Sequence, residues 1–175
     1  MVQKIWLPCL AGALFLGLAG LMLPAGALAA ADLVPFKELV PFVELKMPGW
    51  EQESKPEGVT MKTDQMKMSQ AGATYRSGDK TLEVHIMDGL AAAGTLMSLG
   101  QKFEMETGDQ YVKTTKIQNF SAWETFDRKE KSGNLMINVA GRFLVTLTGR
   151  GLENTEPLKA AAQQMDLNKL AALAK

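Results

Sequence analysis

Few side chains in this sequence could do chemistry, because it holds one histidine and one cysteine. His85 lies in a stretch of alternating apolar and polar residues, which predicts a strand, and Met87 shares its face. A hairpin with the preceding segment would place Gly72 opposite His85 and Met68 diagonal to Met87. Two thioethers and an imidazole are ligands that select Cu(I), so Met68, His85 and Met87 form a candidate copper site. The alternative is that Met66, Met68 and Met87 pack under a second covering helix and that His85 lies at its rim.

Several other kinds of site lack the residues that they need. A single histidine excludes multi-histidine metal sites within one chain, and the single cysteine, Cys9, lies in an apolar leader. Gly149-Arg150-Gly151 follows a predicted strand without a later Lys-Ser/Thr pair, so we interpret it as a strand exit and not as a phosphate-binding loop. Glu104, Glu106 and Asp109 have no identified partner for acid–base catalysis. Basic and acidic residues number 19 each and the basic ones are not concentrated, so nucleic acid is not an expected partner.

Residues 1–30 have the pattern of a signal peptide. Lys4 precedes an uncharged stretch from Ile5 to Ala31, and Ala27-Leu28-Ala29 is a small-residue cleavage site. Cleavage would leave a mature chain without cysteine that is periplasmic or secreted and has no membrane attachment. The alternative is an uncleaved anchor, because the uncharged run is long enough to cross a bilayer core of about 30 Å.

The rest of the chain, residues 31–175, is expected to form a single domain with three parts. Residues 31–64 would hold an N-terminal helix and an irregular segment, residues 65–150 a sheet with one helix, and residues 151–175 the C-terminal helices. About this length of chain suffices for one hydrophobic core, and no repeat or low-complexity linker divides it.

One short helix and a loop are predicted in the first part. Apolar residues at near-helical spacing follow Pro35, which can start a helix, and Pro41 is expected to interrupt that helix. The polar stretch from Glu51 to Asp64 has no clear periodicity, and we interpret it as an irregular loop.

A β-hairpin is the clearest local prediction. Segments at about Met66–Arg76 and Thr81–Asp88 flank Gly78-Asp79, which fits a two-residue turn that pairs Ser77 with Lys80. The same register places three further pairs on the core face: Tyr75 with Leu82, Ala73 with Val84 and Ala71 with Ile86. The turn and the apolar pattern therefore predict one register.

The remaining segments predict two kinds of element. Leu90 to Glu106 has helical spacing, and Thr155 and Asp166 can each cap a C-terminal helix. Further strands are expected at Tyr111–Ile117, Phe120–Asp127, Leu135–Val139 and Phe143–Thr148, with tight connections at Ser132-Gly133-Asn134 and Ala140-Gly141-Arg142. The order ββαββββα and the short links predict an α+β fold, a mainly antiparallel sheet of about six strands covered by helices.

Two longer segments carry a resemblance. The stretch from Pro35 through Trp50 to the hairpin Tyr75-Arg76-Ser77-Gly78-Asp79-Lys80, and the strand Gly141-Arg142-Phe143-Leu144-Val145, resemble small exported bacterial proteins of unassigned function. In element order the chain is also similar to PsbP-like domains. That resemblance implies an antiparallel sheet with helices on both faces and a non-catalytic role as an accessory subunit of an extracytoplasmic complex. No functional residue is carried over from it.

The expected function is that of an exported, non-catalytic binding or accessory module whose partner is an unknown envelope protein. An apolar patch around Phe36, Phe42 and Trp50 would favour such a partner surface. The alternatives are a periplasmic copper-handling protein that uses the Met/His face and a small extracytoplasmic hydrolase that uses carboxylates or Ser/Lys groups.

Overall fold

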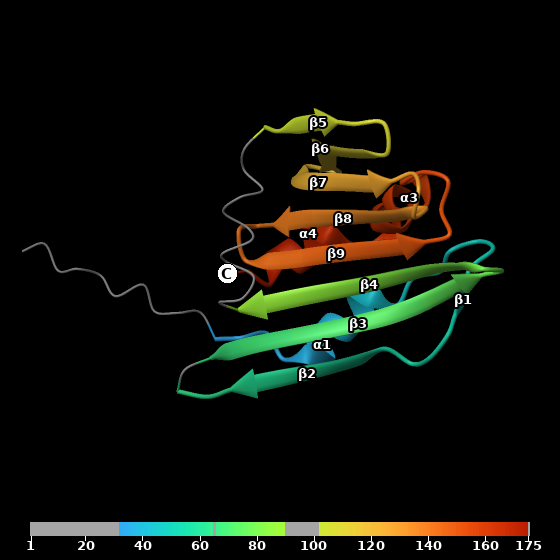
Figure 1. Cartoon of the computed structure of the whole chain (residues 1–175). Coiled ribbons are helices and arrows are strands. Elements are labelled where there is room, and N and C mark those ends of the chain that lie inside the picture. The colour runs from blue at the N-terminus through green and yellow to red at the C-terminus, as the bar shows by residue number, and fades with distance from the viewer. Residues whose placement is uncertain (1–31, 65, 90–101, 175) are drawn as a thin grey trace, which may run out of the picture. The chain divides into compact units, whose positions relative to one another are not determined.

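Within residues 32–64, 66–89 and 102–174, which the computed structural model describes, nine strands form one antiparallel sheet (Figure 1). The strands are β1 (Glu51–Gln52), β2 (Glu57–Lys62), β3 (Lys67–Ser77), β4 (Lys80–Gly89), β5 (Glu104–Glu106), β6 (Gln110–Ile117), β7 (Phe120–Asp127), β8 (Ser132–Val139) and β9 (Phe143–Arg150). Their order is β1-β3-β4-β9-β8-β7-β6-β5, and β2 pairs with β3 beside β1. These residues belong to one compact unit, Ala31–Lys175, and the predicted α+β class with an antiparallel sheet is confirmed.

The hairpin of β3 and β4 has the predicted register. Gly78 adopts a φ of 60° in the turn, a conformation that glycine reaches without steric cost. Ser77 pairs with Lys80, and Tyr75 pairs with Leu82 further along the ladder. Turn chemistry and the apolar pattern thus specify the same pairing.

The hairpin of β8 and β9 also follows the prediction. Its connection is Ala140-Gly141-Arg142, and Val139 pairs with Phe143 next to it. The inward side chains of both strands are fully buried: Leu135, Ile137, Val139, Phe143, Val145 and Leu147. They form the centre of the core together with the inward residues of β4.

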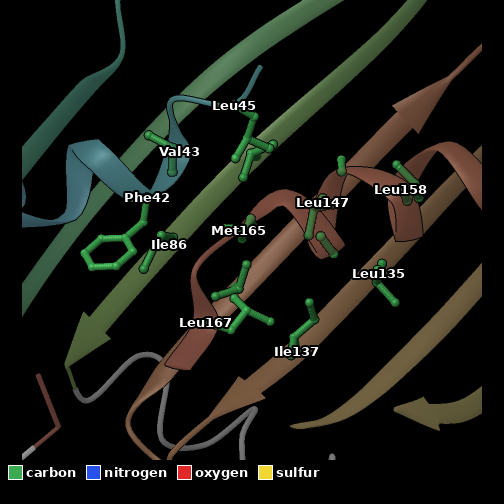
Figure 2. Packing of buried hydrophobic residues seen from close by; sticks show 14 of the residues in the cluster. Phe42, Val43, Leu45, Ile86, Leu135, Ile137, Leu147, Leu158, Met165 and Leu167 are labelled. Carbon is green, nitrogen blue, oxygen red and sulfur yellow. The ribbon is translucent and has the colours of Figure 1, made fainter. Parts of the chain in front are cut away.

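The described helices α1 (Phe36–Val43), α3 (Glu156–Gln164) and α4 (Leu167–Ala172) pack on one face of the sheet, here called the helix-covered face (Figure 1). Figure 2 shows Phe42 and Val43 of α1, Leu158 of α3 and Leu167 of α4 directed toward this face, where they join the core cluster. Each buried leucine stabilises the fold by about 1.5–3 kcal/mol. None of the helices in the described ranges is long and apolar enough to cross a membrane.

The Tyr75 hydroxyl holds the end of α1 against β3. It donates a hydrogen bond to the Val43 carbonyl at 2.5 Å and accepts one from the Leu45 backbone N–H at 2.6 Å. Tyr75 is buried, and this burial raises the pKa of its hydroxyl. Two backbone groups that would otherwise be buried without partners are therefore satisfied by one side chain.

Asp88, at the end of β4, holds the segment that precedes α1. Its carboxylate accepts a hydrogen bond from the Val34 backbone N–H at 2.8 Å and bonds from two nitrogens of Arg142 at 2.9 and 2.8 Å. Arg142 also donates to the Asp32 carbonyl at 2.6 Å. The described N-terminal residues are thus tied to the β8–β9 connection through a buried ion pair.

The sheet has more strands than predicted because its edges carry little apolar pattern. The interpretation of residues 51–64 as an irregular loop is wrong, since β1 and β2 lie there and pair with β3 through backbone hydrogen bonds. The predicted helix at 90–106 is wrong at its end, where β5 pairs with β6. Residues 90–101 of that prediction lie outside the described residues. Most side chains in β1, β2 and β5 are exposed. Because no face of these strands is buried, their sequences lack the apolar alternation by which a strand is predicted.

Three local predictions also need correction. Pro41 does not interrupt α1, which continues to Val43 because Phe42 and Val43 are buried beyond the proline. Ser132-Gly133-Asn134 lies inside β8 and is not a turn. A Cβ on Gly133 would lie 3.2 Å from Leu158, so the lack of a side chain at this position lets α3 pack closely on β8. The hydroxyl of Thr155 makes no capping bond, whereas the predicted cap at Asp166 accepts from the Lys169 N–H at 2.9 Å.

Replacement of Tyr75 by Phe tests whether its hydroxyl anchors α1. The ring would stay in place, while the Val43 carbonyl and the Leu45 N–H would lose their buried partner. We expect the free energy of unfolding, measured with urea, to fall by about 2 kcal/mol. A loss below about 0.5 kcal/mol would mean that α1 is held by its apolar contacts alone.

Candidate functional site

The face of the sheet opposite the described helices, here called the outer face, carries the candidate site. Successive side chains of a strand point to opposite faces, so the residues between the core positions point outward. The registers of six strand pairs align one row across this face: Glu57, Gly72, His85, Thr146, Met136, Trp123 and Thr114. The row joins residues from β2 to β6 that are far apart in the sequence.

His85 lies where the sequence predicts it, opposite Gly72 and on the outer face. A Cβ added to Gly72 would lie 2.5 Å from His85 Nδ1, so the imidazole packs over this glycine. His85 Nε2 lies 3.8 Å from a carboxylate oxygen of Glu83, and the His85 side chain is 54% exposed. The ring borders a hollow of about 380 Å³ that Gln70 and Thr74 also line.

Met68 and Met87 share that face, but the three candidate ligands are spread along it. Met68 pairs with Gly89, whereas Gly72, the residue opposite His85, lies four residues further along β3, about 13 Å at the rise of a strand. Met87 lies between them and packs against Leu144. The registers alone do not place the three side chains around one ion, and Cu(I) binding stays a prediction of the sequence.

An apolar cluster lies beside His85 on the outer face. Leu144 of β9 packs there with Met87 of β4, Met136 of β8 and Trp123 of β7. These four residues, from four neighbouring strands, are here called the outer cluster. The ring of Phe103 stacks on Trp123 with centroids 6.0 Å apart and planes 23° apart. Phe103 itself is 44% exposed. The cluster was not predicted from the sequence, although outward Trp123 and Met136 interrupt the polar side of two amphipathic strands.

A hollow with a mixed polar and apolar lining, here called the outer hollow, adjoins the cluster over β6, β7, β8 and β9. Its volume is about 360 Å³, and its outward-facing polar residues include Gln110, Thr125, Asp127, Asn134, Thr148 and Arg150. Asn134 donates to the Thr148 hydroxyl at 3.0 Å. Its own Oδ1 and the neighbouring Trp123 Nε1 are buried and have no hydrogen-bond partner among the described residues.

Glu124 is the most buried carboxylate, and it faces α3 on the helix-covered side. Its Oε1 accepts from Thr155 Oγ1 at 2.5 Å and from the Tyr111 hydroxyl at 2.7 Å, and Lys159 Nζ lies 3.1 Å from Oε2. Burial raises the pKa of the Glu124 carboxyl, but the hydrogen bonds from Thr155, Tyr111 and Lys159 outweigh it, so the pKa lies below its ordinary value. Such a group stays ionised near neutral pH, whereas a general acid or base should titrate there. Through its bonds to Thr155 and Lys159, the Glu124 carboxylate instead ties α3 to the sheet.

The other candidate groups are not brought together. Glu104, Glu106 and Asp109 are exposed, and the Glu106 carboxylate pairs with Arg128 at 2.5 Å. Within the described ranges, His, Cys, Asp and Glu form no group of three that could hold a metal ion.

The expected apolar patch around Phe36, Phe42 and Trp50 is not an exposed surface. Phe42 is buried in the core, and Trp50 is half-buried against it. Phe36 is half-buried, and its ring approaches the Gly58 position of β2. These three side chains therefore do not form the exposed partner surface that the sequence predicts.

Substitution of Glu124 by Gln tests the tether to α3 through its pH dependence. A carboxyl whose pKa is lowered in the folded state stabilises the fold above the pKa of the unfolded chain, and this contribution is lost as the pH falls through the folded-state pKa. We expect the variant to lose about 3 kcal/mol at pH 7, since Lys159 would lose its buried partner. Below about pH 5 the stability of the variant should depend less on pH than that of the wild type.

Glu156 supplies the matched control for that experiment. Its exposed carboxylate contacts the same lysine, with Lys159 Nζ 3.0 Å from Oε1. Glu156→Gln should change the unfolding free energy by less than about 0.5 kcal/mol, because solvent screens an exposed pair. Equal losses in the two variants, measured by urea unfolding at pH 7 and pH 4, would contradict the assigned role of Glu124.

No family model, no curated protein and no solved structure matches this chain. The function is therefore inferred from its own residues.

Proposed function

We propose that this protein is an exported, non-catalytic binding or accessory module and that its partner contacts the outer face. The observation that carries the proposal is the outer cluster, formed by Met87, Leu144, Met136 and Trp123 on the face that bears none of the described helices. Leu144 is buried and the other three residues are half-buried, and an apolar cluster that stays partly exposed on a sheet face is one mark of an interaction site. Export rests on the signal-peptide pattern of residues 1–30, whether that segment is cleaved or kept as an anchor.

The partner that fits this surface is an amphipathic segment of another envelope protein. The outer cluster is made of Leu144, two flexible methionines and one large aromatic ring, and methionines and aromatic side chains adapt to an apolar partner and are enriched in interfaces. Around it lie uncharged polar residues such as Thr146 and Thr125, which could form a polar rim. None of the four residues of the outer cluster is charged, so a partner that covers the cluster would not bury an unpaired charge there.

A non-catalytic role is supported by what the buried polar groups do. Asp88 and Glu124 are both buried, and each is bonded to groups that hold another segment against the sheet. The buried hydroxyl of Ser69 contacts Thr60 Oγ1 at 2.9 Å, and Thr60 in turn accepts from the Phe36 N–H. These carboxylates and this hydroxyl already have structural tasks, which argues against the hydrolase alternative.

Photo-cross-linking tests the proposed contact surface. A benzoylphenylalanine at Met136 of the 31–175 domain should cross-link an envelope protein in a solubilised envelope fraction of its own cells. The same label at Gln163, an exposed position on α3, is the control and should give no such product. An excess of unlabelled wild-type domain should remove the product, whereas a Met87→Asp domain of equal stability should compete at least about tenfold less well.

Four results would contradict the proposal. The product at Met136 could be missing, it could be matched in yield by the product at Gln163, or it could be competed equally by the Met87→Asp domain. An internal cross-link that maps to residues 90–101 would also overturn it, because the outer face would then be occupied by the chain itself. Mass spectrometry of the digested product separates this last outcome from capture of a partner.

A further inference from the structure

We infer that β2 is the contact strand of a symmetric dimer, in which the same strand of a second copy of this chain extends the sheet. This inference goes beyond the proposed partner contact, because it concerns the edge of the sheet and not the outer cluster. Among the described strands β2 pairs with β3 alone, and Figure 1 shows it at the edge of the sheet. The observations that identify the occupant are the direction of its backbone groups, its side chains and the contrast with β5.

The backbone groups that β2 turns away from β3 follow from the alternation of their ladder. The Thr63 N–H donates to the Met66 carbonyl at 2.8 Å, in the pair that directly continues the register of β2 with β3. Residues of an antiparallel ladder alternately face their partner and face away from it. Gly58, Thr60 and Lys62 therefore direct their N–H and carbonyl groups to the free edge, where no described residue bonds to them. Each offers a donor and an acceptor to an added strand.

A second β2 fits these groups when it runs antiparallel and places its Thr60 opposite Thr60 of the first copy. Gly58 then lies opposite Lys62 of the second copy, and Lys62 lies opposite its Gly58. All three pairs join residues whose backbone groups are free, so each pair can exchange two hydrogen bonds. A two-fold axis relates the copies, and the contact is closed because it uses the free edge of both β2 strands.

The apolar side chains of β2 match in the same register. Val59 and Met61 lie on the outer face, as does Met68, which pairs with Met61. Val59, which is 44% exposed, would lie opposite Met61 of the second copy, and Met61 would lie opposite its Val59. These are non-hydrogen-bonded pairs, in which the side chains come closest. The dimer would therefore cover apolar surface that a single copy leaves exposed.

The charges distinguish β2 from β5, the edge strand at the other end of the sheet. In the β2 pairing Glu57 would lie opposite Thr63 and Lys62 opposite a glycine, so like charges do not face each other. In β5 the residues that turn away from β6 are Glu104 and Glu106, because the residues on both sides of this strand bond to β6. A symmetric pairing through them would place glutamate opposite glutamate, which is destabilising. Of these two edges, β2 is the one whose charges permit a second copy.

The start of α1 lies over β2 and leaves its edge open. The Phe36 N–H donates to Thr60 Oγ1 at 2.9 Å, and a Cβ on Gly58 would lie 2.6 Å from the Phe36 ring. Both contacts are on the helix-covered face, so they hold the strand without using the backbone groups at its edge. β2 is therefore ordered before a second strand arrives, which lowers the entropy cost of association.

Analytical ultracentrifugation of the 31–175 domain tests the inference, since this range forms one compact unit. We expect a reversible monomer–dimer equilibrium between about 5 and about 500 µM, because one strand pair buries less surface than a standard interface. Lys62→Pro removes one edge N–H without touching the ladder with β3, and it should raise the dissociation constant at least about tenfold. The control is Gln52→Pro, at an edge N–H of β1 outside the contact, which should leave the dissociation constant unchanged.

Disulfide trapping tests the register. The 31–175 domain has no cysteine, so an introduced thiol is the only one in each copy. In the inferred dimer, positions 59 and 61 of opposite copies have Cα atoms about 4.5 Å apart, whereas positions 59 of both copies are about 7–8 Å apart. A disulfide requires about 4.4–6.8 Å. Under mild oxidation, an equal mixture of Val59→Cys and Met61→Cys domains should form a mixed disulfide dimer, and either variant alone should form little.

The inference is overturned if the domain is monomeric at every concentration, if Lys62→Pro dimerises as well as the wild type, or if the mixture gives no more disulfide than either variant alone. Binding of a strand from a different protein would leave the domain monomeric, which is the first of these outcomes. Circular dichroism checks that both proline variants fold, and the disulfide experiment needs no proline. The cross-linking at Met136 does not depend on β2, so the two proposals fail separately.

Discussion

The pairing of β4 with β9 is the interaction on which the rest of the structure depends. Every other pairing in the sheet joins strands that are close in the sequence, whereas this ladder joins the hairpin of β3 and β4 to the meander from β5 to β9 (Figure 1). Its inward pairs, Val84 with Leu147 and Ile86 with Val145, are fully buried at the centre of the core. Its outward pair Met87 with Leu144 begins the outer cluster. Core and candidate site are thus two faces of one ladder.

A long-range ladder must overcome the entropy of closing the chain between its strands. Asp88 and Arg142, 54 positions apart in the sequence, form an ion pair at one end of this ladder, next to the pair of Asp88 with Phe143. A buried ion pair adds little net stability over apolar residues of the same shape, but a register in which either charge stayed unpaired would be strongly disfavoured. The pair therefore selects this register, and through Val34 it also fixes where the N-terminal segment lies.

Local rules could predict the hairpins but not this joining. The Gly78 turn and the alternation of Leu82, Val84 and Ile86 determine one register within a few residues, and the structure has that register. The sequence does not show which strand of the meander from β5 to β9 pairs with β4, because β4, β8 and β9 all have the same apolar alternation. For this reason His85 and Gly72 were placed correctly as neighbours, while Trp123 and Met136 were not connected with them. The edge strands were missed for a different reason, since β2 is held mainly by backbone bonds and leaves Val59 44% exposed.

The same alternation divides the outer face into two chemical zones along the strand direction. On β7 the outward residue Trp123 is followed by Thr125, and on β8 Met136 is preceded by Asn134. Since these strands are antiparallel, the apolar residues of both lie at one end and the polar residues of both at the other. A ladder slip of two residues would keep the core face inward yet would set Trp123 beside Asn134 and divide both zones. The register that completes the core is therefore also what gathers the outer cluster and the outer hollow into separate, adjoining surfaces.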